Sequence, residues 1–261
     1  MKLKLYCLVV YFVVIPVCSS FAGKTDAMVA WGGQGKNGIY TISFSQRSDG
    51  IWSEPFLISA TSYPKILPAI GSDSRGNIWL AWVELHGLNG RILWSYFSDG
   101  TWSSPDELDT STESVLAPSI AVDASDEAWL VFSGTRKGVD DIFVTHWTGS
   151  DWAIPVSVNK KDQWPDILPV LEIDSSGKPI VLWQGYNGHQ YVQYQSQWNG
   201  VEWSAEEQRR PAPEQVVKEK SFSAYRVDQC IKELPAFIQD RSQAVFHSTF
   251  GQRKTVKFHI R

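Results

Sequence analysis

The sequence predicts an all-β fold, a β-propeller of about five blades with four antiparallel strands in each blade. Four tryptophans recur at intervals of 50, 50 and 51 residues: Trp52, Trp102, Trp152 and Trp203. A repeat of about 40–50 residues that holds several short strands is typical of propeller blades. No helical period appears before residue 205, so an α/β fold is a poor alternative.

A second block recurs sixteen or seventeen residues after each of the first three of these tryptophans. It reads LPAIGSDSRGNIWLAW at 67–82, LAPSIAVDASDEAWLVF at 116–132 and LPVLEIDSSGKPIVLW at 168–183. A degenerate copy, LPAFIQDRSQAVFHS, lies at 234–248, and DAMVAW at 26–31 resembles the second half of the block. Two matched blocks in each unit favour a structural repeat over coincidence.

Each unit divides into four strands. The first strand runs from the proline of the second block to an aspartate, and a tight turn follows, in which Gly76 and Gly177 are expected to take positive φ. The second strand is the Trp-rich run, such as IWLAW, and a polar loop comes after it. The third strand alternates, as in RILWSYF. An Asp-Gly or Asn-Gly hairpin turn then leads to the fourth strand, which begins at the periodic tryptophan.

Prolines place the fourth strand at the edge of each sheet. Pro55, Pro105 and Pro155 each lie three residues after a periodic tryptophan. Proline has no N–H group to donate to a neighbouring strand, so within sheets it is confined to edges and bulges. The fourth strand is therefore the predicted outer edge of each blade.

Residues 1–22 are expected to be a secretory signal peptide. Two lysines precede an almost wholly apolar run at 5–17, and small residues precede a cleavage site before Gly23. The run is shorter than the roughly 20 residues that a membrane-spanning helix needs. We expect an exported protein, periplasmic or secreted, with no transmembrane segment in the mature chain. The mature chain keeps only Cys230, so no internal disulfide is expected.

Residues 23–261 are expected to form a single propeller domain with an irregular insertion at about 205–228. The insertion is charged and contains prolines, which is typical of a solvated loop. The first unit lacks its first strand and the last unit lacks its fourth, so the two ends are expected to meet where the ring closes. Two alternatives stay open: a four-bladed propeller that borrows 234–240 for its first unit, and an open propeller completed by self-association.

The charge balance argues against nucleic acid as a partner. The chain carries 24 Lys and Arg against 28 Asp and Glu, a net charge of −4. A nucleic-acid-binding surface needs clustered positive charge. We therefore expect a glycan or another cell-surface ligand, with no nucleic acid and no cofactor.

The repeated blocks resemble those of the sialidase-like β-propellers with Asp-box (BNR-type) repeats. The pattern Ser-Asp-Gly-x-Trp-Ser-x-Pro at 48–55 and 98–105 carries the resemblance, in a shortened form of the Asp-box. In that family the Asp-box is structural and lies away from the ligand face. The resemblance therefore implies turn and core roles for Asp49, Asp99 and Trp102.

The resemblance does not extend to sialidase activity. Sialidases use an arginine triad, an early Arg-Ile-Pro motif and a Tyr/Glu pair. This chain has no Arg-Ile-Pro after its signal region, and the mature chain before Trp52 offers only Arg47, beside a turn. No motif singles out a pair of catalytic carboxylates. We therefore predict no catalytic residue and favour a protein that is not an enzyme.

The loops after the second strands and the connections before the first strands are expected to open on one face, where ligands bind. Aromatic, amide and charged side chains gather there, and these groups suit sugars. Six residues are the predicted ligand-binding set: Glu84, His86, Arg136, Trp164, Tyr186 and His189. Tyr63 lies in the same kind of connection as Trp164. No close His, Asp or Cys cluster supports a metal site.

Three functions stay open at this level. The first is an exported propeller that binds carbohydrate or another surface ligand on its loop face. The second is a glycoside hydrolase of an unrecognised family, which needs two carboxylates about 5–10 Å apart. The third is an envelope scaffold for protein–protein interaction.

Overall fold

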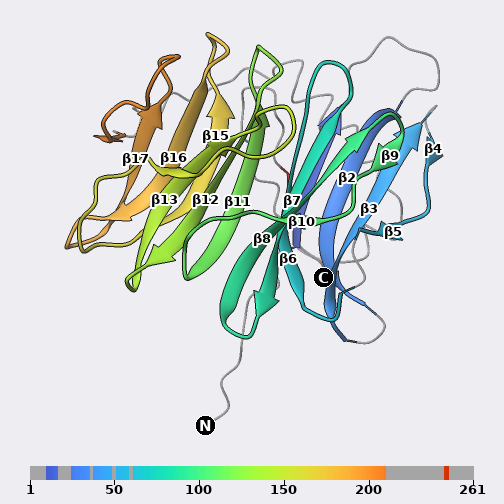
Figure 1. The fold of residues 1–261 in the computed structure, drawn as a ribbon, viewed down its shortest axis with the longest axis horizontal. Helices are drawn as coiled ribbons and strands as arrows, with labels where there is room; N and C mark the ends of the chain where they lie inside the picture. Colours follow the sequence, from blue (N-terminus) through green and yellow to red (C-terminus); the bar gives the residue numbers. More distant parts are fainter. Residues whose placement is uncertain are drawn as a thin grey trace, which may run out of the picture.

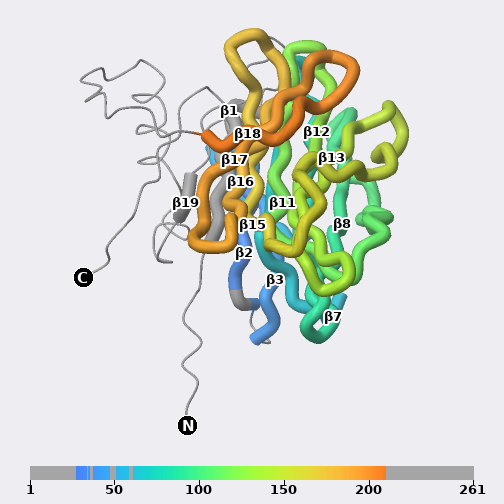
Figure 2. The backbone as a smooth tube through the Cα atoms, turned by 90° about the vertical axis from the view of Figure 1, so that its left-hand side faces the viewer, coloured from blue at the N-terminus to red at the C-terminus, as the bar shows by residue number. Residues whose placement is uncertain are grey.

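The computed structural model describes residues 10–16, 25–35, 38–48, 51–58, 61–209 and 244–246. Every regular element in these ranges is a β-strand, and the strands form four sheets that stand side by side (Figure 1). Figure 2 turns the molecule so that the last sheet faces the viewer. No helix long and apolar enough to cross a membrane occurs in this part of the chain.

We number the sheets as blades 1 to 4. Blade 1 holds β1 (Val10–Pro16), β2 (Thr25–Gln34), β3 (Tyr40–Ser48), β4 (Ile51–Trp52), β5 (Phe56–Leu57) and β19 (Ala244–Phe246). Blade 2 holds β6 (Lys65–Ser72), β7 (Ile78–His86), β8 (Asn89–Ser98), β9 (Thr101–Trp102) and β10 (Asp106–Glu107). Blade 3 holds β11 (Ser114–Val122), β12 (Ala128–Arg136), β13 (Val139–His146) and β14 (Val156–Ser157). Blade 4 holds β15 (Asp166–Ile173), β16 (Pro179–Tyr186), β17 (Tyr191–Gln197) and β18 (Glu207–Gln208). The predicted antiparallel units are confirmed in blades 2 to 4.

Blade 1 differs from the prediction at one edge. The first unit was expected to lack its first strand, but β1 occupies that position and pairs antiparallel with β2, from Phe12↔Trp31 to Pro16↔Ala27. β19 pairs with β1 in parallel. β1 comes from the apolar run of the expected signal peptide, and cleavage before Gly23 stays a prediction.

The number of blades and the closure of the ring stay predictions as well. The insertion at about 205–228 lies outside the described residues beyond position 209, and so does the last unit, 234–261, apart from β19. The predicted turn residue Asp49 also falls outside the described ranges.

The outer strand of each blade is broken, in blades 1 to 3 at its proline. In blades 1 and 2, a short piece at the periodic tryptophan (β4, β9) and a second piece beyond the proline (β5, β10) both pair with the third strand. In blades 3 and 4 the first piece shrinks to single bridges, Trp147↔Trp152 and Trp198↔Trp203. The expected edge position of these prolines is confirmed.

The first strand of blades 2, 3 and 4 carries a β-bulge at one repeated position. Leu67, Ala117 and Leu168 have φ of 54°, 52° and 53°, and each precedes a proline. The strand register shifts at each of these points. A non-glycine residue at positive φ is strained, and proline cannot donate to the ladder. The bulge therefore interrupts the regular hydrogen-bond ladder near the start of each of these strands.

The core lies between neighbouring blades, and tryptophans dominate it. Three buried clusters join blade 1 to blade 2, blade 2 to blade 3, and blade 3 to blade 4. The periodic tryptophan of each of blades 2, 3 and 4 packs against the preceding blade: ring centroids are 5.1 Å apart for Trp102 and Phe44, 6.4 Å for Trp152 and Trp94, and 5.7 Å for Trp203 and Trp129. The tryptophan repeat thus follows from a packing contact made at each seam.

The turns after the first strands also join neighbouring blades. The backbone N–H and the hydroxyl of Ser74 donate to the Asp126 carboxylate at 2.8 and 2.6 Å. The N–H of Ala124 donates to the carbonyl oxygen of Gly177 at 3.2 Å. Gly177 has φ of 82°, and an added Cβ would lie 2.5 Å from the Cβ of Ala124. Glycine is required there, which agrees with the predicted positive φ.

Candidate functional site

The start of each first strand lies beside the end of its second strand, because the two strands are antiparallel. Register pairs Lys65 with Glu84 in blade 2, Val115 with Gly134 in blade 3, and Asp166 with Gly185 in blade 4. We call this end of the blades the loop end. All six predicted site residues lie at this end, in or beside the loops that join second to third strands or first strands to the preceding blade.

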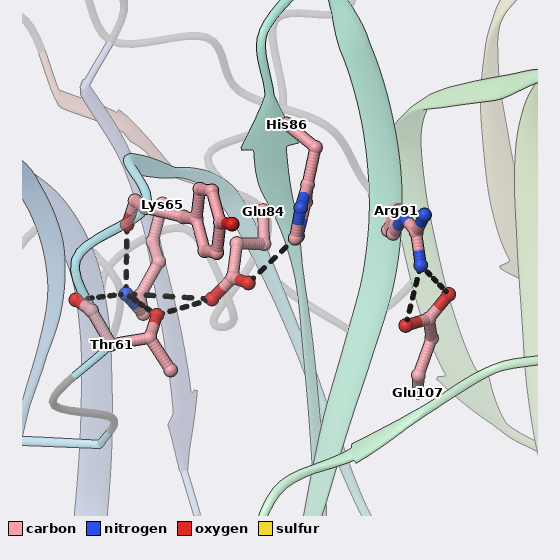
Figure 3. Close-up of polar contacts among 7 residues, drawn as sticks. Thr61, Lys65, Glu84, His86, Arg91 and Glu107 are labelled. Carbon is pink, nitrogen blue, oxygen red and sulfur yellow. Dashed lines mark hydrogen bonds and ion pairs between the residues drawn. The ribbon is translucent and has the colours of Figure 1, made fainter.

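In blade 2 the loop end holds a buried ion pair. Lys65 is fully buried and Glu84 is nearly so, with the Nζ atom of Lys65 3.5 Å from the Oε2 atom of Glu84 (Figure 3). The Lys65 ammonium also donates to the Thr61 hydroxyl at 2.6 Å, to the Thr61 carbonyl at 3.1 Å and to the Tyr63 carbonyl at 2.8 Å. Burial lowers the pKa of Lys65, and the Glu84 carboxylate opposes that shift.

Glu84 links this buried pair to the surface. Its Oε2 atom accepts a hydrogen bond from the Thr61 hydroxyl at 2.6 Å, and its Oε1 atom lies 3.0 Å from the Nε2 atom of His86. With the carboxylate ionised, Nε2 is the nitrogen that carries the proton and donates. The His86 ring stacks on the Tyr63 ring, with centroids 3.9 Å apart and an interplanar angle of 29°.

Tyr63 is 44% exposed, so this stacked pair of rings faces solvent. Arg91 and Glu107 form a separate, half-exposed ion pair on the same blade at 3.1 Å (Figure 3).

In blade 4 the loop end holds a buried carboxyl group. Asp166 accepts hydrogen bonds from the indole N–H of Trp183 at 2.8 Å and from the Asn159 amide at 2.7 Å. Burial is the main reason that the pKa of Asp166 rises to about 7, with the two hydrogen bonds opposing it. The same Asn159 amide donates to Asp141 at 2.8 Å. Asn159 therefore bridges two carboxyl groups, one from blade 3 and one from blade 4.

Aromatic side chains lie close to this carboxyl group in the chain and in the sheet, because Trp164 precedes Asp166 by two residues and Tyr186 follows Gly185, the register partner of Asp166. Trp164 and Tyr186 meet edge to face with centroids 5.3 Å apart, and Tyr186 meets Tyr191 in the same way at 5.3 Å. Trp164 is 37% exposed and Tyr191 is 49% exposed. A Cβ on Gly188 would lie 3.4 Å from the Trp164 ring, so this indole packs against the loop of its own blade. We call Trp164, Tyr186 and Tyr191 the aromatic surface of blade 4.

Blade 3 shows what the fold alone requires at these positions. Its equivalent pair is Val115 and Gly134, which carry no polar side-chain group. Burying charge is costly unless the charge is paired and hydrogen-bonded. Blades 2 and 4 bury charged or ionisable side chains at a position that blade 3 fills without any polar side chain. Buried polar groups at such positions are candidates for a functional role.

The structure places the six predicted residues in different surroundings. Glu84 and His86 are brought together in blade 2, and Trp164 and Tyr186 are brought together in blade 4. Arg136 lies over the Phe143 ring at 4.3 Å and donates to the Thr110 carbonyl, which is a packing role. His189 is exposed on its loop, where its backbone N–H donates to the Asn187 side chain. No described group of three His, Cys, Asp or Glu residues is placed to hold a metal ion.

Sequence reasoning missed Lys65, Asn159, Asp166 and Tyr191. A signal for two of them was present. Lys65, Val115 and Asp166 each lie three residues before the proline of the repeated block. A charged residue at an apolar position of a repeat is informative, because the repeat itself shows what packing needs there.

Comparison with known proteins identifies the fold. No protein-family model matches the chain, and no curated protein matches it in sequence. A protein of unknown function from Dyadobacter fermentans is 13% identical with a TM-score of 0.55, and the match covers 78% of this chain and 70% of that one. The intramolecular trans-sialidase from Ruminococcus gnavus, solved with oseltamivir carboxylate, is 9% identical with a TM-score of 0.55, covering 80% and 71%. An ulvan lyase, a polysaccharide lyase, is 15% identical with a TM-score of 0.50, covering 73% and 57%. At these identities the likeness shows a shared fold, and that fold agrees with the predicted propeller.

Proposed function

We propose that this chain is an exported, sialidase-like β-propeller that binds a carbohydrate at its loop end. The aromatic surface of blade 4 beside Asp166 carries the proposal. Partly exposed rings offer flat faces to sugar C–H groups, and the buried hydrogen bond between Asn159 and Asp166 holds the strand that follows Trp164 in place. The stacked Tyr63 and His86 rings of blade 2 present a second surface of the same kind, supported by Glu84.

The comparisons support this proposal at the level of ligand class. Two proteins that share the fold, the trans-sialidase and the ulvan lyase, are named for activities on sugars. Their low identities transfer no residue role to this chain. Export is proposed from the predicted signal peptide.

The geometry around Asp166 favours binding over hydrolysis. A glycoside hydrolase places two carboxyl groups on either side of the bond that it breaks. Asp141 and Asp166 lie close enough to share one amide nitrogen, but that amide occupies the space between them. A glycosidic oxygen has no room there, so this pair is better suited to holding the loop end in shape.

A glycan array probed with residues 23–261 tests the proposal. We expect selective binding that falls at least about tenfold in the variants Trp164→Ala and Tyr186→Ala, since each removes a ring worth about 1–2 kcal/mol of contact. Phe56→Ala is the matched control, because Phe56 is similarly exposed (40%) but lies on the outer edge of blade 1.

Three outcomes would overturn the proposal. A blank array would favour the envelope scaffold, and pull-downs from envelope extracts would follow. New reducing ends released from a bound glycan would favour a glycoside hydrolase. Binding that Phe56→Ala weakens as much as Trp164→Ala would move the site away from the loop end.

A further inference from the structure

A groove runs between blades 2 and 3 at the end of the molecule opposite the loop end. It is an open groove with a volume of about 760 Å3, lined by the turns that follow the first strands and by the ends of the third strands. Small-ligand pockets usually measure about 300–1,000 Å3. None of the residues discussed above for the loop end lines it.

Three aromatic rings form one wall of the groove. Trp79 and Tyr96 of blade 2 have centroids 5.1 Å apart, and Tyr96 stacks on Trp147 of blade 3 at 5.5 Å and 24°. The rings contact each other, so no ligand enters between them. Tyr96 and Trp147 are partly exposed and present an aromatic surface to the groove.

Blade 2 leaves a hydrogen-bond donor unused at this wall. In blade 3 the indole N–H of Trp129 donates to Asp123 at 3.0 Å. In blade 2 the equivalent oxygen of Asp73 accepts from Asn77 at 2.7 Å and from Arg75 at 3.3 Å instead. The indole N–H of Trp79 has no hydrogen-bond partner among the described residues, and Trp79 lines the groove. The difference between the blades thus comes from Asn77 and Arg75.

The charged groups of the groove differ in how far their hydrogen-bonding atoms are already used within the protein. Arg75 is paired with Asp73 at 3.2 Å, and Asp126 is bonded to Ser74. Glu127 and His146 lie 3.8 Å apart, and their side chains are 38% and 42% exposed. A carboxylate beside an imidazole can accept from and donate to neighbouring hydroxyls, whereas it repels an anion.

We propose that this groove is a second binding site, for a neutral saccharide. The sugar packs against the exposed part of the stacked Tyr96 and Trp147 pair, and its hydroxyls bond to Glu127 and His146. This site is independent of the loop end, because the two share no residue. It differs from a sialidase site in ligand charge, since Glu127 disfavours an acidic sugar.

Calorimetric titration of the full chain tests this site. The probes are four neutral hexasaccharides (gluco-, manno-, galacto- and xylo-configured) and, as the acidic probe, hexagalacturonate. We expect at least one neutral probe to bind, and hexagalacturonate to bind at least about tenfold more weakly. Glu127→Ala and His146→Ala are expected to weaken the neutral probe at least about tenfold, and both side chains are exposed enough to be removed without harm to the core.

Two variants serve as controls. Gln197→Ala changes the position in blade 4 that is equivalent to His146, outside the groove, and is expected to leave binding unchanged. Trp164→Ala separates the two sites, because it is expected to affect the loop end alone. The groove is overturned if no neutral probe binds, if binding is insensitive to both groove variants, or if the acidic probe binds as well as the neutral one. Loss in Trp164→Ala alone would overturn the groove and keep the loop-end proposal.

Discussion

Lys65 and Glu84 show how a single pair of residues can serve a site at a cost to the fold. Lys65 is fully buried, and its equivalent in blade 3 is a valine facing a glycine. Removing one partner of a buried pair leaves an uncompensated charge and typically costs about 3–5 kcal/mol. Replacing both partners by groups that pack removes that penalty.

The first prediction uses blade 3 as a template for blade 2. We expect Glu84→Gly alone to lower the free energy of unfolding by about 3–5 kcal/mol. The double variant Lys65→Val with Glu84→Gly recreates the blade 3 pair, and we expect it to recover most of the loss, while sugar binding through His86 weakens. Chemical denaturation measures the free energy of unfolding of both variants, and the glycan array measures their sugar binding. A double variant no more stable than the single one would show that the pair holds the fold together.

The second prediction concerns Asp166 and pH. Burial raises the pKa of Asp166 to about 7 from an ordinary 3.8. Between these values the folded protein keeps a proton that the unfolded chain has released, so the free energy of unfolding falls as pH rises from about 4 to 7. One pKa unit is about 1.4 kcal/mol, so the fall is on the order of 4 kcal/mol.

Asp166→Asn removes this titration, and we expect the fall between pH 4 and 7 to disappear in that variant. Urea unfolding at several pH values measures it. Asp106→Asn, which changes an exposed carboxylate on the outer edge of blade 2, is expected to keep the fall. Equal pH dependence in wild type and Asp166→Asn would contradict the assignment.

At the scale of elements, the tight turns between antiparallel strands depend on glycine for two separable reasons. Gly100 and Gly177 have φ of 80° and 82°, but an added Cβ meets nothing within 4 Å at Gly100, whereas at Gly177 it lies 2.5 Å from Ala124. Positive φ alone costs a residue with a Cβ about 1–2 kcal/mol. At Gly177 the steric clash with Ala124 adds to the free-energy cost of positive φ.

The third prediction follows from this pair of glycines. We expect Gly100→Ala to lower the free energy of unfolding by about 1 kcal/mol, and Gly177→Ala to lower it by at least about 2 kcal/mol. Thermal or urea unfolding of both variants gives the comparison. Equal losses would mean that the contact between the turns of blades 3 and 4 relaxes freely.

The fourth prediction concerns the seams between blades. Trp82 is completely buried in the cluster that joins blades 1 and 2, whereas Trp164 is 37% exposed. We expect Trp82→Ala to cost about 3–5 kcal/mol of unfolding free energy and Trp164→Ala less than about 1 kcal/mol. The comparison separates the tryptophans that build the propeller from the one proposed to meet a ligand. A large loss in Trp164→Ala would assign it to the core.

At the scale of the whole molecule, the first blade takes its first strand from the N-terminal segment. Its β2 edge is covered by β1, which belongs to the predicted signal peptide. An uncovered edge strand is a template for pairing with another chain. We therefore expect that removal of β1 by N-terminal processing uncovers the β2 edge and changes the assembly state.

The fifth prediction is that the exported chain begins at Gly23 and self-associates. Mass spectrometry of the exported protein gives the first residue, and sedimentation over a range of concentrations gives the assembly state. A variant with Ala22→Glu, which removes the small residue before the cleavage site, is expected to keep β1 and to remain monomeric. A processed chain that is monomeric at all concentrations would show that another segment covers the β2 edge.

The sequence by itself determined the repeat, the four-stranded units and the edge position of Pro55, Pro105 and Pro155. These features are local, because turn chemistry and the missing N–H of proline act wherever they occur in a chain. The sequence also predicted Glu84, His86, Trp164 and Tyr186 as site residues, since loops with aromatic and polar residues were expected on one face. Only the tertiary structure decided which of these residues meet, that Arg136 packs on Phe143, and that β1 covers the edge of β2. It also revealed Lys65 and Asp166 as buried groups and the groove between blades 2 and 3. These contacts depend on which strands lie beside each other in the folded chain. The free-energy cost of burying a charge likewise arises only when the blades pack together and exclude water.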